Sequence, residues 1–128
     1  MRIDHIALWV SDLEGMRQFY GKYFGAASNK KYENPGKGFE SYFLEFGTGA
    51  RVEMMKRHNI NQKPDRRIES LGFAHLALSV GSKEKVDEVT RKLQGDGFSV
   101  MQSPRHTGDG CYESIVLDPE GNQIEITV

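Results

Sequence analysis

The sequence Ile3-Asp4-His5-Ile6-Ala7-Leu8-Trp9-Val10 has a second copy later in the chain, Phe73-Ala74-His75-Leu76-Ala77-Leu78-Ser79-Val80. In each copy a histidine is followed by an aliphatic residue, Ala, Leu, one variable residue and Val, and the two histidines are 70 residues apart (75 − 5). Side chains alternate in character along both copies, as in a strand that buries one face. A repeat at a fixed offset indicates two copies of one structural unit. We therefore predict two similar modules, each opening with a histidine-bearing strand.

Size and composition limit the kind of protein. The chain has 128 residues, which suits one domain with its own core, and a net charge of −1, which favours neither nucleic acid nor an anionic membrane as partner. Cys111 is the one cysteine, so no internal disulfide is expected. The N-terminus lacks the apolar run of a signal peptide, and no stretch approaches the ~18 apolar residues of a membrane-spanning helix. We expect a soluble cytoplasmic domain.

The first module is predicted to contain a strand, a helix and three more strands. Ser11 and Glu14 fit a capping box at the start of the helix, and Gly25 fits its end. A hairpin follows, with Phe39–Phe46 and Arg51–Lys56 as its strands.

The second module repeats this order. Ser82 fits the start of its helix, and Phe98–Met101 is predicted to be a short strand. Ser103–Gly110 contains a proline and two glycines and is predicted to be a loop. The strong turn sequence Asp118–Asn122 joins the last two strands, Tyr112–Leu117 and Gln123–Val128.

These elements predict an α+β fold made of two βαβββ modules within a single domain. The modules span residues 1–56 and 72–128, and residues 57–71 form the linker between them. Neither module is large enough to cover its sheet alone. We therefore expect the two sheets to form one curved, cup-like sheet with the helices outside.

Two glutamates repeat together with the two histidines. Glu53 lies on the last strand of the first module and Glu125 on the last strand of the second, 72 residues apart (125 − 53). Strand alternation places both, with His5 and His75, on the face opposite the apolar residues. One such residue alone is usually only solvated, whereas four at repeat-related positions indicate a shared site. Two imidazoles and two carboxylates fit Zn, Ni, Co, Mn or Fe(II) better than Ca or a thiolate-bound metal.

The sequence resembles the vicinal oxygen chelate superfamily, which is the glyoxalase, bleomycin-resistance and dioxygenase family, and most of all its glyoxalase I (lactoylglutathione lyase) branch. Four segments that span the whole chain carry the resemblance: His5-Ile6-Ala7-Leu8, Arg51-Val52-Glu53, His75-Leu76-Ala77-Leu78 and Leu117-Asp118-Pro119-Glu120-Gly121-Asn122-Gln123-Ile124-Glu125. The resemblance implies that His5, Glu53, His75 and Glu125 ligate one octahedral divalent ion with two waters. Ni or Zn is expected ahead of Co, Mn or Fe.

The resemblance also implies a reaction. In glyoxalase I the substrate is the hemithioacetal of a 2-oxoaldehyde and glutathione, and a base removes the C1 proton to give an enediolate that is reprotonated at C2. The implied base is a ligand carboxylate, assigned to Glu125 with Glu53 as its counterpart. We therefore predict a metal-dependent lyase or isomerase acting on a thiol adduct of a 2-oxoaldehyde or on a related vicinal-oxygen substrate.

Two positions depart from the glyoxalase I pattern and leave the substrate open. That family has an arginine four residues after the first ligand and an asparagine four residues after the first glutamate, where this chain has Trp9 and Arg57. Together with Phe73 and Arg105, these side chains are predicted to contact the substrate.

Alternative activities exist within the same superfamily. Fosfomycin thiol transferases and extradiol dioxygenases use two histidines and one carboxylate, and Glu53 argues against both. Methylmalonyl-CoA epimerase has glutamine at the position of Glu53, but its similar proton transfer keeps a CoA-ester epimerase activity open. A bleomycin-resistance-type protein binds its drug without metal, and the complete set of ligand types argues against that function.

The resemblance also bears on oligomeric state. The family pairs its modules either within one chain or by exchange between two chains. In the exchanged form, His5 and Glu53 meet His75 and Glu125 of the partner subunit. A homodimer of the exchanged kind is favoured.

Overall fold

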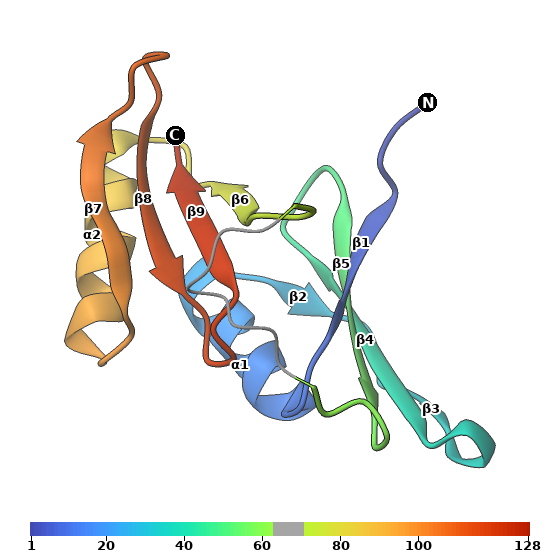
Figure 1. The fold of residues 1–128 in the computed structure, drawn as a ribbon. Helices are drawn as coiled ribbons and strands as arrows, with labels where there is room; N and C mark the ends of the chain where they lie inside the picture. Colours follow the sequence, from blue (N-terminus) through green and yellow to red (C-terminus); the bar gives the residue numbers. More distant parts are fainter. Residues whose placement is uncertain (63–70) are drawn as a thin grey trace. The chain divides into compact units, whose positions relative to one another are not determined.

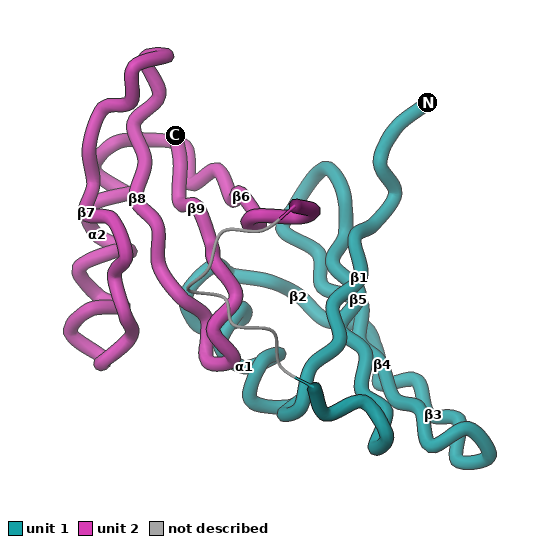
Figure 2. Tube along the Cα trace, in the orientation of Figure 1, with its two compact units in different colours: residues 1–63 teal, residues 64–128 magenta. Residues whose placement is uncertain are grey.

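The computed structural model describes residues 1–62 and 71–128. The chain divides into two compact units, Met1–Lys63 and Pro64–Val128 (Figure 2). Most of the predicted linker, residues 57–71, lies outside the described residues. Each unit contains one α-helix and one mixed sheet (Figure 1).

The first unit has the strand order β1-β5-β4-β2, and β3 pairs with β4 beyond that path. β1 is parallel to β5, whereas β4 is antiparallel to β5. The helix α1 packs on β4 and β5. The elements are β1 (His5–Trp9), α1 (Leu13–Phe24), β2 (Ala27–Ser28), β3 (Tyr32–Asn34), the 3₁₀ turn η1 (Pro35–Lys37), β4 (Phe39–Glu45) and β5 (Arg51–Arg57).

The second unit has the strand order β6-β9-β8-β7, with β6 parallel to β9 and the other pairs antiparallel. Its elements are β6 (Leu76–Ser79), α2 (Lys83–Gly95), β7 (Val100–His106), β8 (Tyr112–Leu117) and β9 (Gln123–Thr127). The predicted α+β class is confirmed. That the two sheets form one curved, cup-like sheet stays a prediction.

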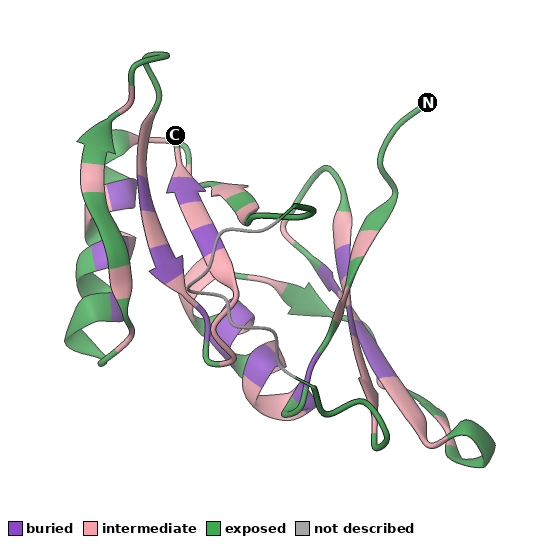
Figure 3. Ribbon diagram, viewed as in Figure 1, coloured by how far each residue is buried: buried purple, intermediate pink, exposed green. Residues whose placement is uncertain are grey.

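The core of each unit lies between its helix and one face of its sheet. Alternate residues of β5 and β9 are buried, including Val52 and Met54 in the first unit and Ile124 and Ile126 in the second (Figure 3). Burial of one face fixes the register, because a slip by one residue would turn these apolar side chains to the opposite face.

In the described part of the chain, neither α1 nor α2 is long and apolar enough to cross a membrane.

The start of α1 differs from the prediction by one residue. Asp12, rather than Ser11, is the N-cap, and its carboxylate accepts a hydrogen bond from Gly15 N at 3.0 Å. Ser and Asp are equally good caps, so the sequence could not choose between them. The predicted end at Gly25 is confirmed, because this residue adopts the left-handed conformation with φ of 66°.

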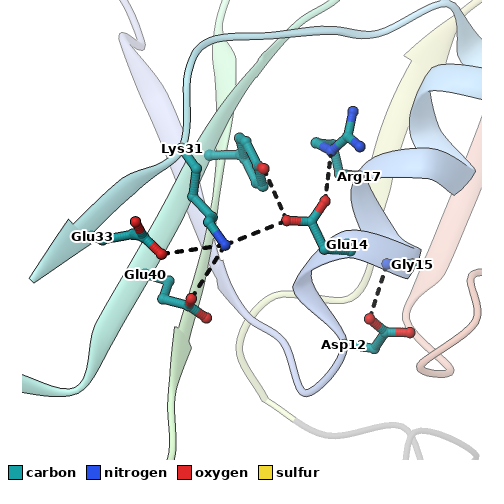
Figure 4. Close-up of polar contacts among 8 residues, drawn as sticks. Asp12, Glu14, Gly15, Arg17, Lys31, Glu33 and Glu40 are labelled. Atoms are coloured by element: carbon teal, nitrogen blue, oxygen red, sulfur yellow. Dashed lines mark hydrogen bonds and ion pairs between the residues drawn. The ribbon is translucent and has the colours of Figure 1, made fainter. Parts of the chain in front are cut away.

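The carboxylate of Glu14 belongs to a polar network that ties α1 to the sheet (Figure 4). It accepts a hydrogen bond from Tyr42 Oη at 2.9 Å and pairs with Arg17 at 3.1 Å and with Lys31 at 3.7 Å. The Tyr42 hydroxyl, with Arg17 and Lys31, holds the pKa of Glu14 below its ordinary value. Since the lowered pKa belongs to the folded state, this stabilisation is present above the pKa of an unfolded glutamate, about 4.3, and is lost as the pH falls.

Replacing Tyr42 by Phe is expected to lower the free energy of unfolding by about 1 kcal/mol at neutral pH, because the ring stays and only the hydrogen bond to Glu14 is lost. The loss should shrink at acidic pH, because the carboxylate of Glu14 is protonated as the pH falls below its lowered pKa. Urea unfolding at both pH values measures the difference. Tyr32→Phe is the matched control, because the Tyr32 ring is exposed. An equal loss at both pH values would contradict the assignment.

The strand β7 is longer than predicted. Ser103–Gly110 was predicted to be a loop, but β7 continues to His106, so Arg105 lies on a strand. β7 is at the edge of its sheet, where Pro104 is tolerated because a proline there removes no ladder hydrogen bond. The register shifts twice along β7, which is typical of an irregular edge strand.

Candidate metal centre

The first unit brings His5 and Glu53 together on the face away from its core. Ala7 of β1 is in register with Glu53 of β5, so His5 lies two residues before the position opposite the glutamate. His5 Nε2 is 3.9 Å from Glu53 Oε2. The side chains are 39% and 18% exposed, so both remain open to a ligand.

The second unit brings His75 and Glu125 together in the same way. His75 immediately precedes β6, and Ala77 is in register with Glu125 of β9. His75 Nε2 is 3.2 Å from Glu125 Oε2, and the side chains are 37% and 17% exposed. The two His–Glu pairs therefore share their register, their facing atoms and their exposure.

Each pair supplies one nitrogen and one oxygen donor. Across residues 1–62 and 71–128, no three His, Cys, Asp or Glu side chains form a group that could hold a metal ion. A catalytic ion such as Zn takes three or more protein ligands. Each pair alone is therefore short of that number, although its imidazole and carboxylate are donor types that suit Zn, Ni or another transition metal.

Asp4 forms a hydrogen bond with the histidine of the first pair, and Arg51 holds Asp4 in place. His5 Nδ1 lies 2.9 Å from Asp4 Oδ2, and Arg51 Nη2 donates to the same oxygen at 2.6 Å. These hydrogen bonds from His5 and Arg51 lower the pKa of Asp4. With its Nδ1–H donated to Asp4, His5 presents Nε2 as the free ligand atom. Ala74 occupies the corresponding position before His75, so the second pair has no such carboxylate.

Sequence reasoning missed the role of Asp4. Neighbouring residues on a strand point to opposite faces, so alternation separates Asp4 from His5. Asp4 instead immediately precedes β1, and its carboxylate lies beside the His5 ring. The one signal in the sequence was the Asp-His dipeptide itself.

Trp9 and Arg57, two of the predicted substrate-binding residues, meet further along the same face as the first pair. The Arg57 guanidinium carbon lies 5.5 Å from the Trp9 ring centroid and 5.9 Å from that of Phe39. The two aromatic rings meet edge to face, with centroids 6.1 Å apart. Trp9 and Phe39 thus form an aromatic surface against which the Arg57 guanidinium packs.

The other two predicted substrate-binding residues belong to the second unit. Phe73 lies two residues before His75 and is 92% exposed. Arg105 Nη1 is 3.6 Å from Glu113 Oε1, and Arg105 Nη2 also donates to Gln102 Oε1 on its own strand. The charge of Arg105 is therefore already paired within β7 and β8.

The turn between β8 and β9 is built around the buried carboxylate of Asp118. Its Oδ1 accepts hydrogen bonds from the backbone N–H groups of Glu120 and Asn122 at 2.9 and 2.8 Å, and its Oδ2 accepts one from Asn122 Nδ2 at 2.8 Å. Gly121 has φ of 84°, which favours glycine. This turn sets the register that places Glu125 opposite Ile115. The Asp-Pro-Glu-Gly-Asn segment thus positions a predicted ligand.

The sequence model of the glyoxalase/bleomycin resistance protein/dioxygenase superfamily matches residues 2–126. The chain belongs to this superfamily. The superfamily was predicted from the sequence, and the match confirms it. Members of the superfamily differ in reaction, so membership alone does not name a substrate.

Bacterial proteins include relatives of this chain. The uncharacterized protein YqjT of Bacillus subtilis is 30% identical over 125 residues, covering 95% of this chain and 94% of that protein. The lactoylglutathione lyase of Escherichia coli O157:H7 is 28% identical over 127 residues, covering 98% of this chain and 91% of that protein. The chain therefore spans nearly the whole length of these relatives.

Solved structures of the superfamily share the fold. The crystal structure of glyoxalase I from Zea mays superposes with a TM-score of 0.81 at 22% identity, covering 98% of this chain. The chain spans 44% of the length of the maize protein. At this identity the likeness shows the fold and leaves activity open.

Proposed function

We propose that this protein is a metal-dependent glyoxalase I-like lyase or isomerase, acting on a thiol adduct of a 2-oxoaldehyde or a related vicinal-oxygen substrate. The observation that carries the proposal is the matched geometry of the two His–Glu pairs. Both pairs face Nε2 to Oε2, and in both the histidine lies two residues before the residue in register with the glutamate. A lactoylglutathione lyase among the relatives supports it.

The four residues would together hold one divalent ion, with Ni or Zn expected first. When bound, such an ion would stabilise the negative charge that develops on two neighbouring substrate oxygens. Glu125 is proposed to accept the proton from C1 and return it at C2, and Glu53 is its counterpart. Asp4 holds His5 in the tautomer that leaves Nε2 available.

The substrate contacts are proposed to come from Trp9, Arg57, Phe73 and Arg105. Trp9 and Arg57 extend the face that carries the first pair, four residues beyond His5 and Glu53 on their strands. The tryptophan replaces the arginine of the glyoxalase I pattern. We therefore propose that the thiol part of the substrate contacts β1 through the Trp9 ring, whereas glutathione would contact an arginine at this position.

A substrate series tests the proposed reaction. The Ni- or Zn-loaded protein is incubated with methylglyoxal and glutathione, then with adducts of other thiols and with CoA esters. Formation of the 2-hydroxyacyl thioester, or exchange of the C1 proton with deuterated water, supports the proposal. Proton exchange on a CoA ester alone would move the substrate class to the epimerases. A metal-loaded protein without exchange on any member would contradict the proposed function.

One metal site needs both His–Glu pairs. We propose that the chain forms a homodimer in which the first pair of one subunit joins the second pair of the partner subunit. One variant carries His5→Ala and Glu53→Gln, and a second carries His75→Ala and Glu125→Gln. In an exchanged dimer, mixing the two variants creates one intact site per mixed dimer. Metal binding and turnover are then expected to return on mixing.

As a control, each of the two variants is mixed separately with the wild type. Native mass spectrometry then measures whether mixed dimers form. Mixed dimers that form without any recovery of metal binding would contradict exchange, because pairs that meet within one chain cannot complement each other.

The cytoplasmic location stays a prediction that rests on the composition of the chain.

A further inference from the structure

The histidines of the two His–Glu pairs have different surroundings. Nε2 of His5 faces Glu53, and the other ring nitrogen, Nδ1, lies 2.9 Å from Asp4 Oδ2. Ala74 stands in the place of Asp4 before His75, and its side chain has no polar atom. The two pairs therefore share a register but differ in what holds the imidazole.

Arg51 holds Asp4 against His5 with both its backbone and its side chain. It is the residue of β5 in register with His5, and its backbone N–H donates to the carbonyl oxygen of Asp4 at 3.0 Å. Its Nη2 donates at 2.6 Å to Asp4 Oδ2, which is the oxygen that meets the His5 ring. One carboxylate oxygen is thus fixed between a guanidinium and an imidazole.

The ring of Phe43, on β4, packs against both Arg51 and His5. Phe43 is in register with Glu53, so it lies on the face that carries the first pair. Its ring centroid is 4.5 Å from the Arg51 guanidinium carbon and 5.4 Å from the His5 ring centroid. Stacking on an aromatic ring suits a planar guanidinium. Phe43 thereby restricts where the Arg51 and His5 side chains can lie.

The second unit has different side chains at the positions of Arg51 and Phe43. Gln123, which is uncharged, lies two residues before Glu125 on β9. Ile115, which is not aromatic, is in register with Glu125 on β8. The side chains that hold the first histidine are therefore particular to the first unit.

These surroundings favour opposite tautomers of the two imidazoles when both are neutral. The Asp4 carboxylate favours hydrogen on Nδ1 of His5 and leaves Nε2 with a free lone pair. Glu125 Oε2 is 3.2 Å from Nε2 of His75, against 3.9 Å for the corresponding atoms of the first pair, and so favours hydrogen on Nε2. A metal ion binds the ring nitrogen that carries no hydrogen. His5 is therefore oriented for an ion, whereas His75 first has to change its tautomer.

We propose that Arg51 is a positioning residue, which acts through Asp4 to hold His5 ready for the divalent ion, and that His75 is the ligand that rearranges when the ion binds. The role rests on the proposed function, because it requires both histidines to ligate the ion. Arg51 was not among the predicted site residues. The two histidines are then unequal ligands, although their strands repeat one another.

The ring tautomers can be measured without metal and without turnover. Metal-free protein with isotope-labelled histidine is studied by nitrogen NMR in mildly alkaline buffer, where an ordinary imidazole is neutral. The signals are assigned with His5→Ala and His75→Ala. We expect hydrogen on Nδ1 of His5 and on Nε2 of His75. Arg51→Gln should move the His5 ring toward a mixture of tautomers and leave the His75 ring unchanged.

The direction of the change in metal affinity separates positioning from simple charge. Arg51→Gln removes a positive charge near the ion, so electrostatics alone would strengthen the binding of a cation. Loss of positioning should instead weaken binding about tenfold, which is the lower end of what the partners of metal ligands contribute. Isothermal titration with Zn measures the change. Arg51→Lys keeps a charge that can pair with Asp4 and should recover part of the affinity.

Lys56→Gln is the matched control, because it removes the same charge from β5 five residues beyond Arg51. Its affinity for Zn should not fall. Arg51→Gln that binds Zn as tightly as the wild type, or the same tautomer in both rings, would overturn the proposal and leave the metal site intact. A wild type that binds no metal would instead contradict the proposed function, and the tautomers would still decide whether the two rings are held differently.

Discussion

Replacing Glu125 by Gln is expected to lower turnover by about 100-fold or more, because the change removes the proposed base together with one metal ligand. The amide is similar in size, so the sheet should be undisturbed. Turnover is measured at saturating metal on whichever substrate the wild type converts. Circular dichroism checks that the variant is folded.

Glu88→Gln is the matched control, because Glu88 is an exposed carboxylate on α2 of the same unit. It should leave turnover unchanged. Glu53→Gln separates the base from its counterpart: a larger loss there than in Glu125→Gln would exchange the two roles. Turnover by Glu125→Gln within tenfold of the wild type would contradict the assignment of Glu125 to the reaction.

Replacing Asp118 by Ala is expected to lower the free energy of unfolding by about 3 kcal/mol, because three donors lose their charged acceptor within a buried turn. The expected loss is large because Asp118 is 4% exposed, so little water is available to replace the carboxylate. Urea unfolding followed by circular dichroism measures the change.

Asp118→Asn provides the graded comparison. The amide oxygen can still accept from the two backbone N–H groups, whereas the bond from Asn122 Nδ2 is lost, so we expect roughly half the loss. Metal affinity should fall in parallel, because the turn sets the register of Glu125. Asp118→Ala as stable as the wild type would show that the register is set elsewhere.

The repeat and the strand alternation predicted most of the fold. Burial of one sheet face forces a period of two, so a register read from Val52, Met54, Ile124 and Ile126 also places the residues between them. That is why His5 and Glu53, and likewise His75 and Glu125, could be assigned to the face of their own sheet that lies away from the core. The structure adds that the two pairs share the same offset.

Other features depended on contacts between distant segments. Lys37 and Arg57 meet through the pairing of β4 with β5, and no local pattern links them. The extension of β7 through Pro104 depended on its place at the sheet edge. The proposed meeting of the two His–Glu pairs depends on the association of whole units, which strand alternation does not encode.

The central claim is that the two His–Glu pairs together bind one divalent ion. Isothermal titration of metal-free protein with Ni or Zn tests it most directly, with bound metal then counted by mass spectrometry. We predict one ion per chain, lost in both His5→Ala and His75→Ala and kept in His106→Ala, whose histidine lies outside both pairs. No bound ion in the wild type, or binding that survives both His5→Ala and His75→Ala, would contradict the claim.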